Sequence, residues 1–315
     1  SLPSYNYFFI NFFTFPFFFY VLVHNLKYNI INTFFSGWLF GFGYFSSNLY
    51  WISNSLRFDE NFENLIIVSV FLIPFFLSFF YGLFSLILKI FNLEMNFNSI
   101  LIFSLTLSIM EYLRGTIFGG FPWNLISFSL INFESSLQIL NFIGTYSLNL
   151  LVITFYCLPV IIFFNFSRIR KFSIFLSVII AIFLNSYYGQ NRIKYLEQAD
   201  KKTIYPSIKL VSPKFNIERF FIEEPFEEKL NELIEISQPL NKDFLLIFPE
   251  GMANISDLNH LKKNLIKFSN QLTDNSKIIL GVSIDDDSKI YNSLVLLNKD
   301  FILEDKYNKN KLVPF

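Results

Sequence analysis

Long apolar runs dominate the first 190 residues of the chain, whereas the remainder alternates apolar and polar positions. Six runs approach the roughly 20 residues that a helix needs to cross the hydrocarbon core of a bilayer. They are residues 7–23, 33–52, 65–88, 98–113, 146–167 and 172–187. Pro16, Pro74 and Pro159 lie within three of them, and membrane helices tolerate such prolines when neighbouring groups satisfy the freed carbonyls. The pattern therefore predicts a transmembrane helical domain of six spans over residues 1–190.

The pattern then changes to a polar linker, residues 191–205, and to that of a soluble α/β domain, residues 206–315. Short apolar runs predict strands at 207–212, 243–248, 277–284 and 290–298, and helical periodicity predicts helices at 218–237 and 256–272. The expected order, β-α-β-α-β-β, is typical of a sheet that is covered by helices.

The distribution of charge supports the same division. Of the 50 Lys, Arg, Asp and Glu residues, 13 lie in residues 1–190 and 37 in residues 191–315, so the two parts face different solvents. Hydrophobic residues make up 53% of the chain, more than in an ordinary soluble domain. The net charge is zero and no basic cluster is interleaved with aromatic residues, so we expect no nucleic-acid partner.

Basic residues in the predicted loops indicate an orientation for the membrane domain. The first, third and fifth loops carry or adjoin Lys27, Lys89, Arg168, Arg170 and Lys171, whereas the second and fourth have only Arg57 and Arg114. Because loops rich in lysine and arginine stay in the cytoplasm, the odd-numbered loops are expected there. Six spans then place residues 206–315 on the outer side, which in a double-membraned bacterium is the periplasm.

Two segments of the soluble part carry candidate catalytic residues. In FLLIFPEG, residues 244–251, Glu250 follows an apolar strand and a proline, and α/β folds usually form their sites at the carboxyl ends of strands. A solvated turn residue is the competing interpretation. In KYNKNKLVPF, residues 306–315, Lys309 taken alone is most simply a surface charge.

Taken together, Pro249-Glu250, Gly281-Val282, Tyr291-Asn292-Ser293 and Tyr307-x-Lys309 resemble the nitrilase, or carbon–nitrogen hydrolase, superfamily. That superfamily uses a Glu, a Lys and a Cys. The resemblance implies that Glu250 is the general base for the thiol and that Lys309 stabilises the oxyanion of the tetrahedral intermediate. It also implies that residues 206–315 are the N-terminal part of an α-β-β-α sandwich.

Two membrane segments narrow this resemblance. GWLFGFGYFSSNLYWI, residues 37–52, and EYLRGTIFGGFPWN, residues 111–124, resemble motifs of the bacterial apolipoprotein N-acyltransferase family. The resemblance implies an acyltransferase of lipoprotein biosynthesis in the inner membrane. Its substrates would be a phospholipid acyl donor and the N-terminal diacylglyceryl-cysteine of an apolipoprotein, and the acyl chain would pass through a Cys thioester.

Two interpretations of the second membrane segment stay open. Trp123 is typical of an aromatic anchor at the membrane interface, and Glu111 and Arg114 of an ion pair at a helix end. Alternatively, these three residues together with Phe121 and Pro122 shape a lipid entry beside the soluble domain.

Cys157, the only cysteine, lies in the fifth apolar run with no acid, lysine or histidine near it in sequence, so we expect it to be structural. In the family the nucleophile follows the lysine by some tens of residues, which implies a position beyond Phe315. The family typically has eight membrane helices, and this chain begins with Ser1. We therefore expect a fragment that lacks one helix at each end and has no acyltransferase activity by itself.

Two other functional classes stay open. A membrane-anchored amidase would share Glu250 and Lys309 but gives no reason for the Phe-Pro-Trp-Asn loop and six spans. A non-enzymatic transporter or channel would leave the Pro-Glu and Tyr-x-Lys patterns unexplained. No spacing of His, Cys, Asp and Glu is typical of a metal site, and we expect no cofactor.

Overall fold

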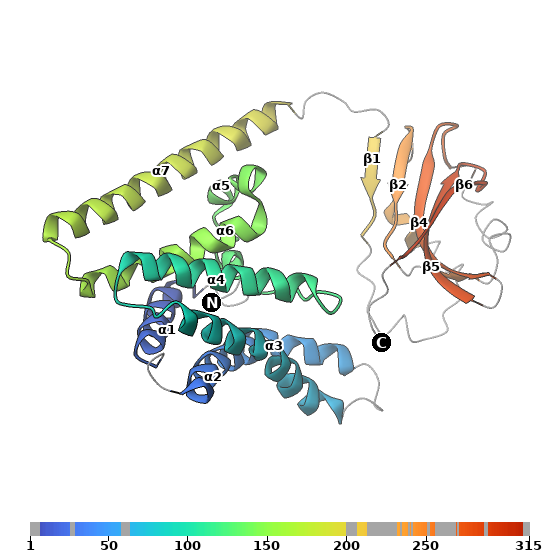
Figure 1. Ribbon diagram of the computed structural model, residues 1–315. Helices are drawn as coiled ribbons and strands as arrows, with labels where there is room; N and C mark the ends of the chain where they lie inside the picture. The colour runs from blue at the N-terminus through green and yellow to red at the C-terminus, as the bar shows by residue number, and fades with distance from the viewer. Residues whose placement is uncertain are drawn as a thin grey trace. The chain divides into compact units, whose positions relative to one another are not determined.

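The structure, a computed structural model, divides into two compact units, Ser1–Ala199 and Asp200–Phe315 (Figure 1). It describes residues 7–25, 29–57, 64–199, 207–212, 232–233, 235–238, 240, 242–250, 253–255, 269, 271–286 and 289–310. The helices of the first unit are α1 (Asn11–Asn25), α2 (Ile30–Leu49), α3 (Leu65–Ile90), α4 (Phe97–Thr116), α5 (Glu134–Leu137), α6 (Leu140–Cys157) and α7 (Arg168–Ala199). Short 3₁₀ segments join or extend them: η1 (Phe8–Ile10), η2 (Tyr50–Leu56), η4 (Ile126–Leu130) and η5 (Leu158–Phe163).

Each of the six predicted spans coincides with a helix. In the part of the chain that is described, four stretches have both the length and the hydropathy to cross a membrane: Phe8–Asn25, Leu65–Ile90, Leu140–Phe163 and Arg168–Gln198. The runs at 33–52 and 98–113 form α2 and α4. Gly, Ser and Asn residues lower the mean hydropathy of α2, and Asn98, Glu111 and Arg114 lower that of α4. Helix α7 continues to Ala199, so residues 191–199 of the predicted linker are helical.

Helices α2 and α3 approach each other closely because glycine lies at their contact. A Cβ atom on Gly37 would lie 2.0 Å from the Ser85 Oγ and 2.2 Å from the Tyr81 carbonyl oxygen, and one on Gly41 would lie 2.8 Å from the Tyr81 Cβ. Small residues at such contacts let helix backbones pack tightly where lipid supplies no hydrophobic driving force.

Aromatic rings fill much of the core of this unit. The Phe103 ring meets those of Phe19 and Phe84 edge-on, with centroids 5.5 and 5.1 Å apart, a favoured geometry for aromatic pairs. Cys157 ends α6 in the same core and is completely buried, which agrees with a structural role.

The second unit contains a mixed sheet. Its described strands are β1 (Ser207–Leu210), β2 (Phe244–Ile247), β3 (Ala253–Ile255), β4 (Lys277–Asp286), β5 (Lys289–Asn298) and β6 (Leu303–Asn308). The order is β1-β2-β4-β5-β6, with β3 also paired to β4. The pairs β1–β2, β2–β4 and β3–β4 are parallel, and the pairs β4–β5 and β5–β6 are antiparallel.

The four predicted strands are confirmed, whereas β3 and β6 were not predicted. The predicted helices at 218–237 and 256–272 fall largely outside the described residues, and the α-β-β-α sandwich stays a prediction. Asp285 and Asp286 end β4, and Asp287 lies outside the described residues.

Candidate functional site

Glu250 lies just beyond the carboxyl end of β2, as the sequence predicted. The Phe248 N–H donates to the Ile279 carbonyl at 2.9 Å, so the chain remains attached to β4 for one residue after the strand. Pro249 has no N–H with which to continue the ladder. The chain therefore leaves the sheet at Glu250.

Gly281, on β4, lets this segment lie against the sheet. A Cβ atom at position 281 would lie 2.7 Å from the Glu250 Cα and 3.1 Å from the Pro249 carbonyl oxygen. Both are backbone atoms, so no side-chain rotation could relieve the overlap. Glycine within a strand commonly marks such a close backbone approach.

Lys309 and Asn292 converge on the Glu250 carboxylate. The Lys309 Nζ donates to the Glu250 Oε1 at 2.9 Å, and the Asn292 Nδ2 donates to the same oxygen at 2.6 Å. The backbone N–H of Lys309 donates to the Asn292 carbonyl at 2.8 Å, which extends the β5–β6 pairing by one residue. The end of β2, the middle of β5 and the end of β6 thus supply one polar cluster.

The electrostatics of this cluster favour the ionised carboxylate. The hydrogen bond from Lys309 is the main cause that lowers the pKa of Glu250, followed by the hydrogen bond from Asn292 and the charge of Lys309. The side chains of Glu250 and Lys309 are 64% and 37% exposed. An ion pair this exposed contributes less than about 1 kcal/mol to folding. The pair therefore contributes little to folding. It does place a proton acceptor, the Glu250 carboxylate, beside a cationic donor, the Lys309 ammonium group.

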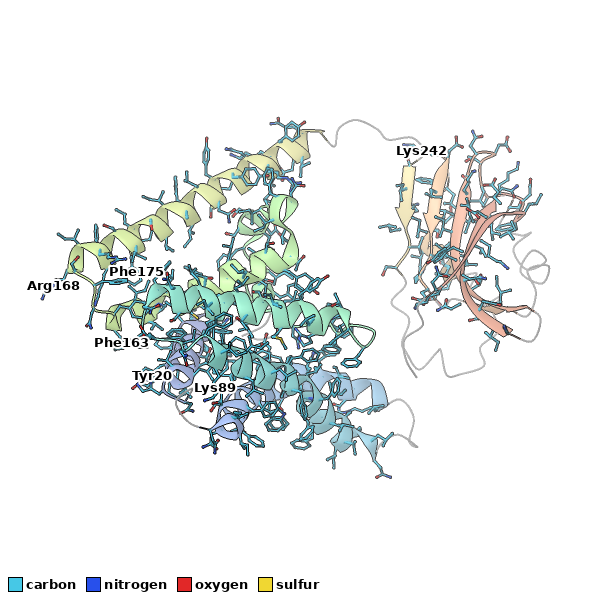
Figure 2. All side chains as sticks on the ribbon, in the orientation of Figure 1. Tyr20, Lys89, Phe163, Arg168, Phe175 and Lys242 are labelled. Atoms are coloured by element: carbon cyan, nitrogen blue, oxygen red, sulfur yellow. The ribbon has the colours of Figure 1, made fainter. Side chains whose placement is uncertain are left out.

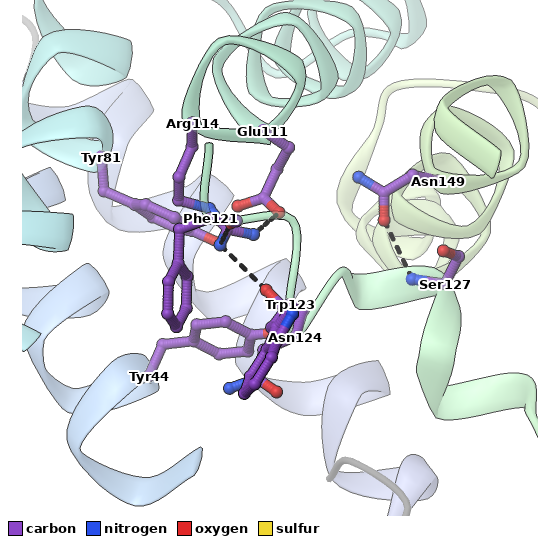
Figure 3. Close-up of polar contacts among 9 residues, drawn as sticks. All are labelled: Tyr44, Tyr81, Glu111, Arg114, Phe121, Trp123, Asn124, Ser127 and Asn149. Carbon is purple, nitrogen blue, oxygen red and sulfur yellow. Dashed lines mark hydrogen bonds and ion pairs between the residues drawn. The ribbon is translucent and has the colours of Figure 1, made fainter. Parts of the chain in front are cut away.

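The second group of predicted residues lies in the helical unit (Figure 3). Glu111 and Arg114 form the predicted ion pair, with Oε2 and Nη2 2.5 Å apart, and both side chains are completely buried within the helical unit. The Tyr81 hydroxyl donates to the Glu111 Oε1 at 3.0 Å. The Arg114 Nη1 donates to the carbonyls of Phe121 and Trp123 at 2.6 and 2.9 Å, which ties α4 to the following loop.

This loop, residues 117–124, turns sharply. Phe118, Gly119, Gly120 and Asn124 all have positive φ angles, between 55° and 87°. A Cβ atom on Gly120 would also lie 2.5 Å from the Gly115 carbonyl oxygen, so both φ and space favour glycine there. The loop is compact because of this turn and because Arg114 binds its carbonyls.

The end of the loop presents aromatic surface. Trp123 is 51% exposed, Pro122 is exposed and Phe121 is half-buried. The Trp123 ring stacks on that of Trp51, with centroids 5.3 Å apart and planes 14° apart. The Tyr44 hydroxyl donates to the Asn124 carbonyl at 2.7 Å, so α2 also holds the loop.

Sequence reasoning missed several of these partners. Asn292 and Gly281 were noted only as parts of motifs, and nothing in the sequence marked Tyr81 as the partner of Glu111. No group of three or more His, Cys, Asp or Glu side chains that could hold a metal occurs among the described residues.

Comparison with known proteins identifies the family. Residues 1–158, half of the chain, match the model of the apolipoprotein N-acyltransferase N-terminal domain. The chain belongs to the apolipoprotein N-acyltransferase family. This confirms the resemblance that the membrane motifs indicated, and the matched residues include the buried ion pair and the loop.

Curated apolipoprotein N-acyltransferases extend the similarity into the second unit. The protein of Rhizobium rhizogenes is 24% identical over 295 residues, which cover 89% of this chain and 54% of that protein. Those of Rickettsia typhi and Rickettsia prowazekii are 29% identical over 290 residues and 27% identical over 313 residues. The Rickettsia matches cover 89% and 96% of this chain, and 56% and 60% of the relatives. The chain thus spans little more than half the length of these apolipoprotein N-acyltransferases.

Proposed function

We propose that the intact protein transfers an acyl chain from a phospholipid to the N-terminal amine of diacylglyceryl-cysteine in an apolipoprotein. The observation that carries this proposal is the convergence of Glu250, Lys309 and Asn292 on one edge of the sheet. Membership of an acyltransferase family supports this reaction over a membrane-anchored amidase or a transporter. We place the enzyme in the bacterial inner membrane, with residues 206–315 in the periplasm.

In the first step, Glu250 accepts the proton of a thiol, and the thiolate attacks the carbonyl carbon of a phospholipid ester. Lys309 stabilises the negative charge that develops on the carbonyl oxygen. When the tetrahedral intermediate collapses, the ester C–O bond breaks. The lysophospholipid leaves with the proton held by Glu250, and the enzyme retains the acyl chain as a thioester.

In the second step, the free α-amino group of the apolipoprotein attacks the thioester carbonyl. Lys309 again stabilises the oxyanion, and Glu250 accepts a proton from the attacking nitrogen. The C–S bond then breaks, the amide is released, and the sulfur regains its proton from Glu250. The same carboxylate therefore serves both half-reactions, in agreement with its ionised resting state.

The thiol in this proposal is not that of Cys157. Cys157 is the only cysteine in these 315 residues, and it is completely buried in the helical unit. We propose that a cysteine beyond Phe315 is the nucleophile, and that residues 1–315 alone form no thioester. Expression of these residues alone, followed by mass spectrometry after incubation with phospholipid, tests this directly.

The helical unit explains how such substrates could be handled. Both carry acyl chains, and taking an acyl chain out of lipid costs about 0.8 kcal/mol per CH₂ group. We propose that Phe121, Pro122 and Trp123 form the lipid entry, and that Glu111 and Arg114 hold this loop in place. Replacing Trp123 with alanine should then slow acyl transfer; an unchanged rate would remove these residues from the lipid entry.

The decisive experiment replaces Glu250 with glutamine in the full-length protein and measures the burst of thioester formation from a phospholipid. Glutamine keeps the size of the side chain but cannot accept the thiol proton, so we expect the burst to disappear. Glu304→Gln is the matched control, because Glu304 forms a similar exposed ion pair with Lys277 at 2.7 Å on the same sheet. A normal burst in Glu250→Gln, or an equal loss in both variants, would contradict the proposal.

A further inference from the structure

An apolar groove of about 340 Å³ lies between α1, the junction of α6 with η5, and α7. Phe12 from α1, Phe155 and Pro159 from the junction, and Phe175 and Val178 from α7 all line it. All of its lining side chains are apolar. A groove of this volume, at the lower end of the usual range for ligand sites, suits a hydrocarbon chain and offers nothing to orient a polar ligand.

The helices that form the groove are candidate membrane spans. The stretches that contain α1, α6 with η5, and α7 all have the length and hydropathy of membrane spans. Only 6% of the apolar window of α7 is buried, so most of the surface of this helix is exposed. The apolar material that surrounds such helices is the acyl chain of a lipid.

Three basic residues lie one to two helical turns from the groove. Lys171 precedes Phe175 by one turn, and its Nζ donates to the Ile162 carbonyl of η5 at 2.6 Å. The Arg170 guanidinium carbon lies 3.9 Å from the centroid of the Phe166 ring. Arg168 begins α7 and is exposed, and Figure 2 labels it near the same end of the helix as Phe175.

No carboxylate in the described part of the chain neutralises these positive charges. Among the described residues, no carboxylate forms an ion pair with Arg168, Arg170 or Lys171. Positive charge that no described carboxylate pairs with, placed beside an apolar groove between candidate membrane helices, complements a lipid that carries a negative headgroup above its acyl chains.

We propose that the groove binds one acyl chain of an anionic phospholipid whose phosphate contacts Arg168 and Arg170. Lys171 is already engaged with η5 and fixes the end of the groove. This site is separate from the residues assigned to acyl transfer, and it does not rest on that function. A zwitterionic lipid of the same chain length would bind more weakly, because its headgroup carries no net charge.

The test titrates phosphatidylglycerol or phosphatidylcholine into the delipidated full-length protein in detergent and counts bound lipids by native mass spectrometry. We expect preferential binding of phosphatidylglycerol, and about a five-fold loss of its affinity for each charge removed in Arg168→Gln and Arg170→Gln. Lys194→Gln is the matched control, because Lys194 is an exposed basic residue far along the same helix.

Filling the groove tests the position of the acyl chain. Val178→Trp and, as a second variant, Ile179→Trp place a large ring on lining positions and should abolish the preferential site. Ile180→Trp changes a neighbouring exposed position that does not line the groove, and it should bind as the wild type does.

Three results would overturn the proposal. Equal losses in Lys194→Gln and the arginine variants would mean general attraction to a positive surface. Wild-type affinity in both groove-filling variants would place the acyl chain elsewhere. Absence of any preference for phosphatidylglycerol in the wild type would mean that Arg168 and Arg170 do not bind an anionic headgroup.

Discussion

Replacing Arg114 with methionine tests whether the buried ion pair of α4 holds the loop of residues 117–124. Methionine retains much of the side-chain length but removes the charge and all donors. The variant loses the ion pair with Glu111 and the hydrogen bonds to the carbonyls of Phe121 and Trp123. The Tyr81 hydroxyl remains as a donor to Glu111.

The expected loss of stability is large. Removing one partner of a buried ion pair costs about 3–5 kcal/mol, because the remaining charge stays buried without compensation. We therefore expect Arg114→Met to lose about 4 kcal/mol, mostly from the isolated Glu111 carboxylate. In the double variant Arg114→Met with Glu111→Leu, no charge is left buried without a partner. The remaining loss is that of three hydrogen bonds, one to Tyr81 and two to carbonyls, about 3 kcal/mol. The double variant should thus be more stable than Arg114→Met.

The measurement is an SDS titration of the full-length protein in mixed micelles, followed by tryptophan fluorescence. Trp38, Trp51 and Trp123 all lie in the helical unit and report its unfolding. The reasoning is refuted if Arg114→Met costs less than about 1 kcal/mol. It is also refuted if the loss in the double variant equals the sum of the losses in Arg114→Met and in Glu111→Leu, because the two residues would then not depend on each other.

Three further predictions concern the sheet edge and the helix contact. Gly281→Ala should displace Glu250, since the added Cβ would lie 2.7 Å from the Glu250 Cα. Thioester formation should fall at least tenfold while circular dichroism stays unchanged, and full activity would disprove this. Because Lys309 lowers the pKa of Glu250, thioester formation should decline only as the pH falls through that lowered pKa. Lys309→Met should move the acidic limb of the pH profile to higher pH. An unmoved limb would exclude Lys309 as the cause of the lowered pKa. Gly37→Ala should cost about 1–3 kcal/mol in the SDS titration, and Gly43→Ala, with nothing within 4 Å of the added Cβ, should cost less; equal losses would argue against a packing role.

The sequence predicted those elements whose signal is local. Every long apolar run became a helix, and the four strands with short apolar runs were found. In β2, β4 and β5 burial imposes that pattern, whereas Ile208 and Leu210 of β1 are exposed. Strand β6, with the sequence LEDKYN, was missed because it is almost entirely exposed and carries no apolar alternation. Strand β3 has only three residues, too few to establish a period.

The candidate site was predicted in part. The resemblance named Glu250 and Lys309, and the structure brings their side chains into contact across 59 residues of sequence. Asn292 was not predicted as their partner, because the sequence around an asparagine in a strand does not indicate which distant residue its side chain contacts. A glycine inside the apolar run around Gly281 was an available signal of close backbone approach that sequence reasoning did not use. Tyr81 and Glu111 meet only because two helices pack, which no local pattern encodes.

The stacked pair of Trp51 and Trp123 makes the loop observable without any label. Two indole rings that are nearly parallel and 5.3 Å apart couple their electronic transitions, which splits the strong far-ultraviolet indole band in circular dichroism. Movement of Trp123 away from η2 would remove that splitting. The stacked pair is therefore a built-in optical reporter of any change in the position of this loop relative to η2.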